Sequence, residues 1–147
     1  MNKRWKPNVT VASVIERDFD GIRKFLLVEE ETRDGLKLNN PAGHLDPGES
    51  PMQGCIRETL EETAFHFMPT ALVGVYMSRF ERVQPDEALP LDKGIVRAVW
   101  LTADEIRNNV PMHRSPLVLT SLEDYLAGRR FPLDVISTDP SVLLQKK

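Results

Sequence analysis

The chain has 147 residues, of which 41% are apolar, and this is the size of one ordinary domain with a real core. Its 19 basic and 22 acidic side chains give a net charge of −3, and no basic stripe is interleaved with aromatic residues. This balance argues against polymeric nucleic acid as a partner. We expect a single domain over residues 1–147.

One cysteine, Cys55, cannot form an internal disulfide, and the first ten residues lack the apolar run of a signal peptide. No apolar stretch approaches the roughly 20 residues that cross a bilayer. We therefore expect a cytoplasmic protein without a membrane segment. Cys55 falls inside a predicted helix, where we expect it to pack rather than to act as a nucleophile.

Two strands are predicted near the start of the chain. Residues 9–16 are rich in β-branched side chains, and residues 24–29 form a second apolar run. A turn cluster at residues 18–21 separates them. The pattern predicts a β-hairpin.

A third, shorter strand follows a second turn at residues 33–35. Leu36 and Leu38 alternate with polar residues until Pro41 ends the run. This strand leads directly into a predicted turn at Gly43.

The next helix has a clear predicted start. Ser50 caps it, Pro51 fits the first helical position, and Gln53 completes a capping box. Apolar and small residues then recur at intervals of three and four, which predicts a core-facing stripe. This stripe consists of Met52, Ile56, Thr59, Leu60 and Thr63.

Strands and helices alternate in the second half of the chain. Residues 71–80 and 94–101 are predicted strands. Residues 102–109 begin with a capping box, and residues 115–128 form a last amphipathic helix. This succession predicts an α/β fold with a mixed sheet that is covered on both faces.

Three glutamates, Glu58, Glu61 and Glu62, are placed at i, i+3 and i+4 near the end of the predicted helix. Carboxylates at this spacing repel one another, and the helix dipole also disfavours negative charge there. A charge run is most often a solvated face. A hard cation such as Mg²⁺ or Mn²⁺ would reverse the repulsion, because it takes oxygen ligands and shares them with substrate phosphates. The cluster therefore predicts a metal site for phosphoryl chemistry.

Two further residues stand in register with these carboxylates. Gly43 allows close approach of the backbone to the helix, and its carbonyl is a candidate fourth ligand. Arg57 lies eight residues after Glu49, a spacing that favours a bidentate pair between them. We assign Arg57 the role of orienting the loop and the helix.

The segment from Gly43 to Glu62, with Glu49 and Arg57 in register, resembles the Nudix box. The resemblance to Nudix hydrolases extends over most of residues 8–136, including the segments 41–45 and 100–106. It implies an α/β/α sandwich and a metal-dependent hydrolase. It also implies that Glu58 and Glu62 are the main ligands, that Glu61 and the Gly43 carbonyl are further ligands, and that Glu58 is a candidate general base.

Three flanking segments, residues 6–12, 114–118 and 131–133, are similar to the bacterial NudJ-type branch of that family. That branch implies a small phosphorylated substrate, either a nucleoside di- or triphosphate or a pyrimidine pyrophosphate of thiamin metabolism.

The family pattern usually has glycine where this chain has Ala64. A left-handed helix end costs alanine about 1 kcal/mol, so we expect the helix to end differently here. Members also usually carry another strand between Phe80 and the acidic stretch 81–92. Either that strand is deleted or a segment is absent from the sequence at this point, and we favour the second, because deletion of a central strand would expose the core.

Several roles stay open at this level. His44 and Arg114 are candidates for substrate contact, with structural hydrogen bonding and a solvated arginine as the alternatives. Glu87 and Asp92 are candidate extra ligands from an acidic loop. The alternatives to a hydrolase are a nucleotide-binding module that senses without turnover, and a cation site that only stabilises the helix.

Overall fold

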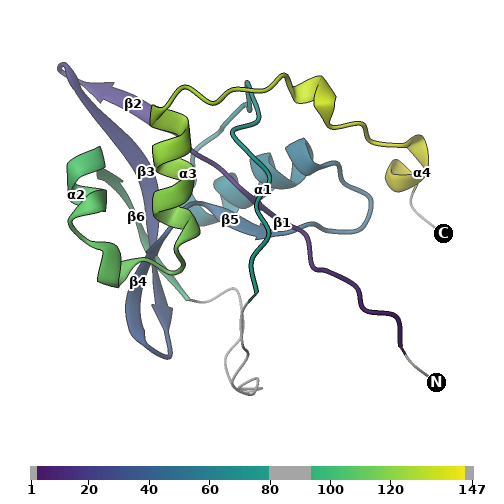
Figure 1. The fold of residues 1–147 in the computed structure, drawn as a ribbon, viewed down its shortest axis with the longest axis horizontal. Helices are drawn as coiled ribbons and strands as arrows, with labels where there is room; N and C mark the ends of the chain where they lie inside the picture. The colour runs from purple at the N-terminus through teal and green to yellow at the C-terminus, as the bar shows by residue number, and fades with distance from the viewer. Residues whose placement is uncertain (1–2, 80–93, 145–147) are drawn as a thin grey trace.

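The structure is a computed structural model, and it describes residues 3–79 and 94–144 (Figure 1). The strands are β1 (Thr10–Ala12), β2 (Glu16–Phe19), β3 (Ile22–Thr32), β4 (Gly35–Asn39), β5 (Ala42–His44) and β6 (Ile95–Leu101). The α-helices are α1 (Pro51–Thr63), α2 (Ala103–Arg107), α3 (Leu117–Leu126) and α4 (Pro140–Leu143), and η1 (Val110–Met112) and η2 (Leu133–Val135) are 3₁₀ turns. The α/β class is confirmed.

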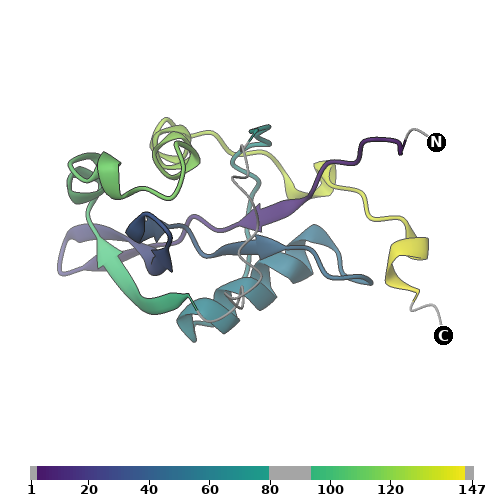
Figure 2. The ribbon, with the colours of Figure 1, turned by 90° about the horizontal axis from the view of Figure 1, so that it is seen from below.

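Strand β3 organises the main sheet. It pairs antiparallel with β2, β4 and β6, and β1 pairs antiparallel with β5 in a second, two-stranded sheet. A parallel bridge joins Leu38 to His113 at the β4 edge. Helices α2 and α3 cover one face of the strands and α1 covers the other, as Figure 2 shows. The two covered faces confirm the expected layered arrangement.

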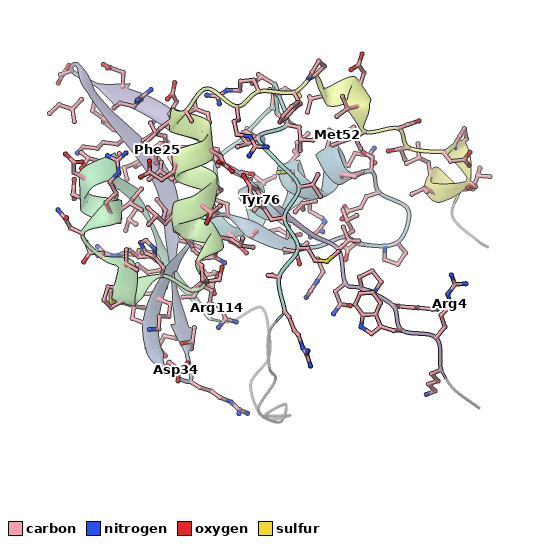
Figure 3. All side chains as sticks on the ribbon, viewed as in Figure 1. Arg4, Phe25, Asp34, Met52, Tyr76 and Arg114 are labelled. Carbon is pink, nitrogen blue, oxygen red and sulfur yellow. The ribbon has the colours of Figure 1, made fainter. Side chains whose placement is uncertain are left out.

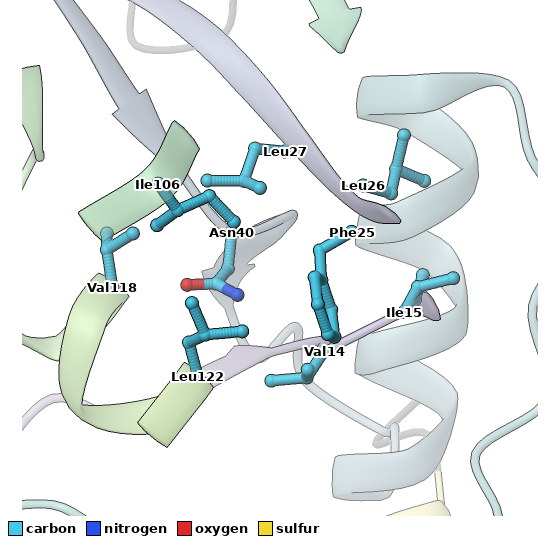
Figure 4. A pocket seen from close by; sticks show the side chains of 9 residues that line it. All are labelled: Val14, Ile15, Phe25, Leu26, Leu27, Asn40, Ile106, Val118 and Leu122. Carbon is cyan, nitrogen blue, oxygen red and sulfur yellow. The ribbon is translucent and has the colours of Figure 1, made fainter. Parts of the chain in front are cut away.

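The core explains why β3 shows no polar alternation. Residues 25–28 are all buried, because the strand is covered on both faces. Phe25 and Leu27 point toward α2 and α3, while Leu26 points toward α1 (Figure 4). Phe25 and Leu27 pack in one cluster with Leu38, Ile106, Val118 and Leu122. Asn40 lies at the edge of this cluster and donates to the Ser13 carbonyl at 3.1 Å, so its amide is satisfied.

The N-terminal hairpin is confirmed in part. Asp20 and Gly21, with φ of 53° and 85°, form the turn between β2 and β3. The predicted strand over residues 9–16 is divided in the structure: the Ser13 N–H donates to the Pro41 carbonyl at 2.9 Å, and the β2 ladder begins only at Glu16. Its first part becomes β1, which pairs with β5.

The sequence predicted a turn at Gly43, but the structure does not place Gly43 in a turn. It is the middle residue of β5 and is paired with Val11 of β1. The prediction was wrong because β5 is only three residues long and its partner is more than thirty residues away. The β1–β5 pairing fixes the backbone of Gly43 beside α1.

The strand predicted over residues 71–80 is wrong for the part that the structure describes. Residues 71–79 are extended, and within the described residues only Leu72 pairs, in an isolated bridge with Phe131. Tyr76 points inward and donates to Asp124 at 2.6 Å, while Val75 is exposed. Residues 80–93 lie outside the described residues, and with them the question of the missing strand and the candidates Glu87 and Asp92.

Helix α1 begins as predicted. Ser50 and Gln53 form both hydrogen bonds of the capping box. The core stripe is confirmed at Thr59 and Thr63, which are buried, but Leu60 is 40% exposed. The buried residues of α1 are small, namely Gly54, Thr59 and Thr63, and the helix contacts β1 and β5.

Ala64 ends helix α1 in the left-handed region, with φ 59° and ψ 15°, and its N–H donates to Leu60. The expectation of a different helix end was therefore wrong. The chain tolerates the strain of alanine at a position that favours glycine.

Replacing Ala64 by glycine is expected to raise the free energy of unfolding by about 0.5–1 kcal/mol, because glycine adopts this conformation without a Cβ clash. Urea denaturation measures it as a higher midpoint with an unchanged slope. Ala127, which caps α3 with φ −71°, is the matched control, and Ala127→Gly is expected to destabilise the chain. A stability gain in Ala127→Gly equal to that in Ala64→Gly would contradict the interpretation.

The last predicted helices are confirmed with small shifts. Thr102 and Glu105 cap α2 with both hydrogen bonds of a capping box, and α3 ends one residue before Ala127. The predicted last helix is not the last element, since η2 and α4 follow it. In the described part of the chain, none of the helices has the length and apolar character needed to span a bilayer.

Candidate functional site

Arg57 is the centre of the site. Its Nε and Nη2 donate to the two carboxylate oxygens of Glu49 at 2.9 and 2.7 Å, which is the bidentate pair expected from the spacing. Nη2 also donates to the His44 carbonyl at 3.0 Å. Nη1 donates to Glu58 at 2.8 Å and to Glu61 at 3.2 Å. One guanidinium thus ties β5 and the following loop to the acidic face of α1.

Glu49 has a structural role in the loop before α1. Its carboxylate also accepts the Asp46 N–H at 2.6 Å, and its side chain is only 13% exposed. The hydrogen bonds from Arg57 hold the pKa of Glu49 below its usual value. Both carboxylate oxygens are occupied, so Glu49 fixes the loop rather than offering a free ligand.

Glu58 lies directly over Gly43. A Cβ built on Gly43 would overlap the carboxyl carbon and both oxygens of Glu58, so any other residue here would force the Glu58 side chain to move. The Glu58 side chain is 15% exposed. Burial raises the pKa of Glu58 in spite of the Arg57 contact. The structure therefore brings together Gly43 and Glu58, as the sequence predicted.

Glu62 lies on the same side of α1, facing β5. Its Oε2 accepts the Ala42 N–H at 3.3 Å. Burial raises the pKa of Glu62 from 4.5 to about 8, and the charges of Glu30, Glu58 and Glu61 add to the effect. In the metal-free protein this raised pKa favours the protonated form of Glu62 at neutral pH.

Glu62 is expected to make the metal-free protein less stable as pH rises from about 4.5 to 8, because its pKa is raised on folding and the folded state binds the extra proton in that window. Urea midpoints measured in EDTA across this range would show the decline. Glu62→Gln is expected to flatten it. A midpoint that rises through this window in the wild type, or the same decline in Glu62→Gln, would contradict the assignment.

Glu30 belongs to this site and was missed. It accepts from Asn39 at 3.1 Å, ion-pairs with Arg114 at 3.4 Å, and lies near enough to Glu62 to raise its pKa. A signal was available, because Glu30 shares a strand face with the buried Leu26 and Val28 and must therefore face α1.

The other predicted residues occupy the rim. The Glu61 side chain is 59% exposed, and of the site residues discussed above it contacts Arg57. His44 is exposed, with Nδ1 3.4 Å from the Thr10 hydroxyl, and contributes its carbonyl to Arg57. Arg114 reaches the site through Glu30 and lies beside the start of α3 (Figure 3). The structure gathers Glu58, Glu62 and Gly43 closely and leaves these three residues around them.

Cys55 packs as expected. Its sulfur lies 3.0 Å from the Ser13 hydroxyl, which in turn contacts Thr59 at 2.8 Å. Burial raises the pKa of the Cys55 thiol, so the reactive thiolate is disfavoured.

The donor set suits a hard divalent cation. Within residues 3–79 and 94–144, no three acidic, histidine or cysteine side chains are grouped to hold an ion, and Arg57 binds both Glu58 and Glu61. Glu58 and Glu62 nevertheless offer oxygen atoms only, and burial raises both pKa values. A cation such as Mg²⁺ accepts oxygen ligands of this kind and offsets the repulsion between them.

Comparison with known proteins relates the chain to hydrolases of the NUDIX family. A family model for the NUDIX domain matches residues 6–120. The chain is 33% identical to Phosphatase NudJ of Escherichia coli (strain K12), over 90% of this chain and 92% of that protein. It is 47% identical to a solved NUDIX hydrolase from Nitrosomonas europaea, with a TM-score of 0.78 over 91% of this chain and 98% of that chain. A C. elegans Ap4A hydrolase in a binary complex, 20% identical with a TM-score of 0.60 over 83% of this chain and 97% of that chain, shares the fold.

Proposed function

The chain belongs to the NUDIX family of hydrolases, and from this premise we propose that it cleaves a diphosphate linkage in a small phosphorylated metabolite with the help of Mg²⁺ or Mn²⁺. The observation that carries the proposal is the pair of carboxylates on one side of α1: Glu58 lies over Gly43 and is bound by Arg57, and Glu62 accepts the Ala42 N–H. As an enzyme of this family the chain is not a sensing module without turnover. The cytoplasmic location stays a prediction.

Glu58 and Glu62 would hold the cation, with the Gly43 carbonyl and Glu61 as further ligands. When bound, such an ion neutralises phosphate oxygens and makes water more acidic. Arg57 keeps Glu58 and Glu61 oriented through its contacts at 2.8 and 3.2 Å. Glu58 accepts the proton of the attacking water, and the burial that raises its pKa makes it a stronger base.

We assign the substrate to the nucleoside di- and triphosphates or to pyrimidine pyrophosphates such as hydroxymethylpyrimidine pyrophosphate or thiamin pyrophosphate. Similarity to Phosphatase NudJ supports a phosphate ester or anhydride substrate. We assign Arg114 to phosphate contact, because its side chain is 53% exposed and, among residues 3–79 and 94–144, makes one ion pair, to Glu30. His44 stands at the exposed rim for a second contact.

The test is a screen of these diphosphate compounds with metal-stripped protein, in which released phosphate and pyrophosphate are measured. We expect no turnover in EDTA and full recovery with Mg²⁺ or Mn²⁺. Turnover that persists in EDTA would contradict the metal role. Binding of substrate and metal without product would contradict the hydrolysis of that compound class.

A further inference from the structure

Glu30 is the centre of a small polar network on β3 that the proposed chemistry does not use. It lies on the face of the strand that packs toward α1, and its side chain is only 16% exposed. Its Oε1 accepts from the Asn39 amide at 3.1 Å, and its Oε2 lies 3.4 Å from Arg114 Nε. A carboxylate that is mostly withdrawn from water needs such partners. Asn39 therefore holds Glu30 in place, and Glu30 in turn restrains the Arg114 side chain.

The backbone that carries Arg114 is fixed on the β4 edge. The Arg114 N–H donates to the Leu38 carbonyl at 2.8 Å, and Leu38 forms a parallel bridge with His113. Lys37 Nζ donates to the carbonyl of Pro111, inside η1, at 2.9 Å. The backbone of Arg114 thus has a set position, and the contact with Glu30 restrains the other end of its side chain.

The guanidinium of Arg114 keeps donors for a ligand. Nε is the atom that approaches Glu30 most closely, and in residues 3–79 and 94–144 no hydrogen bond engages Nη1 or Nη2. These two nitrogens carry four N–H groups in a planar fork, an arrangement that binds phosphate oxygens in pairs. Glu30 also lies near enough to Glu62 for its charge to raise the pKa of Glu62. Arg114 and the proposed metal ligands are therefore related through Glu30, on the α1 side of the sheet.

We propose that Glu30 is a positioning residue, which restrains Arg114 so that Nη1 and Nη2 bind the diphosphate of a substrate held at Glu58 and Glu62. This inference rests on the proposed function, because it concerns the phosphate groups of the same substrate. A long arginine side chain loses rotamer freedom when it binds a ligand, and a contact that restrains it beforehand reduces that loss. Glu30 contributes to substrate affinity in this way without touching the substrate.

The test measures the binding of methylenediphosphonate, in which a CH₂ group replaces the bridging oxygen of pyrophosphate, so that the linkage is not hydrolysed. Binding is measured calorimetrically at saturating Mg²⁺. Glu30→Ala is expected to weaken it by about fivefold or more, the effect of leaving one long side chain unrestrained. Glu30→Gln keeps an oxygen that accepts from Asn39 and Arg114, so it should recover most of the loss. For a compound that is hydrolysed, KM should rise by the same factor, with kcat within about twofold of the wild type.

The same substitution in the Arg114→Ala background separates positioning from a direct role of Glu30. In that background the side chain to be positioned is gone, so Glu30→Ala should weaken binding no further. An equal loss in both backgrounds would overturn the inference, because Glu30 would then act on the cation or on the ligand itself. Tighter binding by Glu30→Ala would overturn it as well, since Glu30 would then compete with phosphate for Arg114. A wild type that does not bind the analogue would also contradict it.

Glu29→Ala is the matched control. Glu29 accepts from Arg97 at 2.7 and 2.9 Å, its side chain is 15% exposed, and it lies next to Glu30 on the opposite face of β3. Its replacement breaks a comparable pair and should leave analogue binding unchanged, whereas the same loss as in Glu30→Ala would overturn the inference. Because the analogue is not turned over, an effect of Glu30→Ala supports the positioning role even if no compound of the screen is hydrolysed, and that failure would count against the proposed function alone.

Discussion

Glu58→Gln is expected to lower kcat/KM for metal-dependent hydrolysis by on the order of 10³-fold, because charge stabilisation by a bound metal is worth several kcal/mol. Glutamine keeps the volume and one oxygen but loses the charge and the proton acceptor. The Glu58 carboxylate sits over Gly43 and is bound by Arg57 at 2.8 Å.

The measurement is kcat/KM at saturating Mg²⁺, with Tm recorded for each variant. Glu31→Gln is the matched control, since Glu31 is an exposed glutamate of β3 outside the site, and it should keep full activity. Glu61→Gln is expected to cost less than Glu58→Gln, because Glu61 lies 59% exposed at the rim. Activity of Glu58→Gln within a factor of about two of the wild type would remove Glu58 from the mechanism.

Gly43→Ala is expected to reduce kcat/KM by on the order of 10²-fold while the chain still folds. The added Cβ would overlap the Glu58 carboxyl group, and Glu58 must move away from its position. The backbone of Gly43 cannot yield easily, because β5 is paired with β1 through Val11. A displacement of about 1 Å at the reacting centre is enough for a loss of this size.

A double-mutant cycle isolates the contact between Gly43 and Glu58. In the Glu58→Ala background the obstructing carboxylate is gone, so Gly43→Ala should cost less stability than it does in the wild type. Urea denaturation of the four proteins gives the coupling. Equal costs of Gly43→Ala in both backgrounds would mean that the two residues do not interact.

Local signals in the sequence were sufficient to predict helix α1 and the arrangement of its carboxylates. The Ser50 and Gln53 capping box depends on residues three apart, and the carboxylate register depends on the helical period alone. The bidentate pair of Glu49 and Arg57 also follows from spacing, once the helix start is fixed. These features were predicted because few distant residues are needed to form them.

Pairings between distant segments were not predicted. Gly43 was assigned to a turn because nothing near it reveals that residues 10–12 supply a partner strand. Residues 71–79 have the composition of a strand, yet within the described residues their pairing is limited to the bridge between Leu72 and Phe131. Local propensity favours extended backbone in both cases, and tertiary contacts decide which extended segment joins a sheet.

Glu30 shows a different limit. It is one of three consecutive glutamates, and a charge run of this kind is usually solvated. The strand period was sufficient to place it on the face of Leu26, but its contacts with Arg114 and Asn39 require the folded β4 edge.

The most direct test of the metal site is a titration of Mn²⁺ into the wild type and into the Glu58→Gln/Glu62→Gln double variant, followed by the EPR signal of the free ion. We expect the wild type to bind Mn²⁺, Mg²⁺ to compete for the site, and the double variant to bind Mn²⁺ at least about 100-fold more weakly. Equal Mn²⁺ affinity of the two proteins would contradict the assignment of these carboxylates.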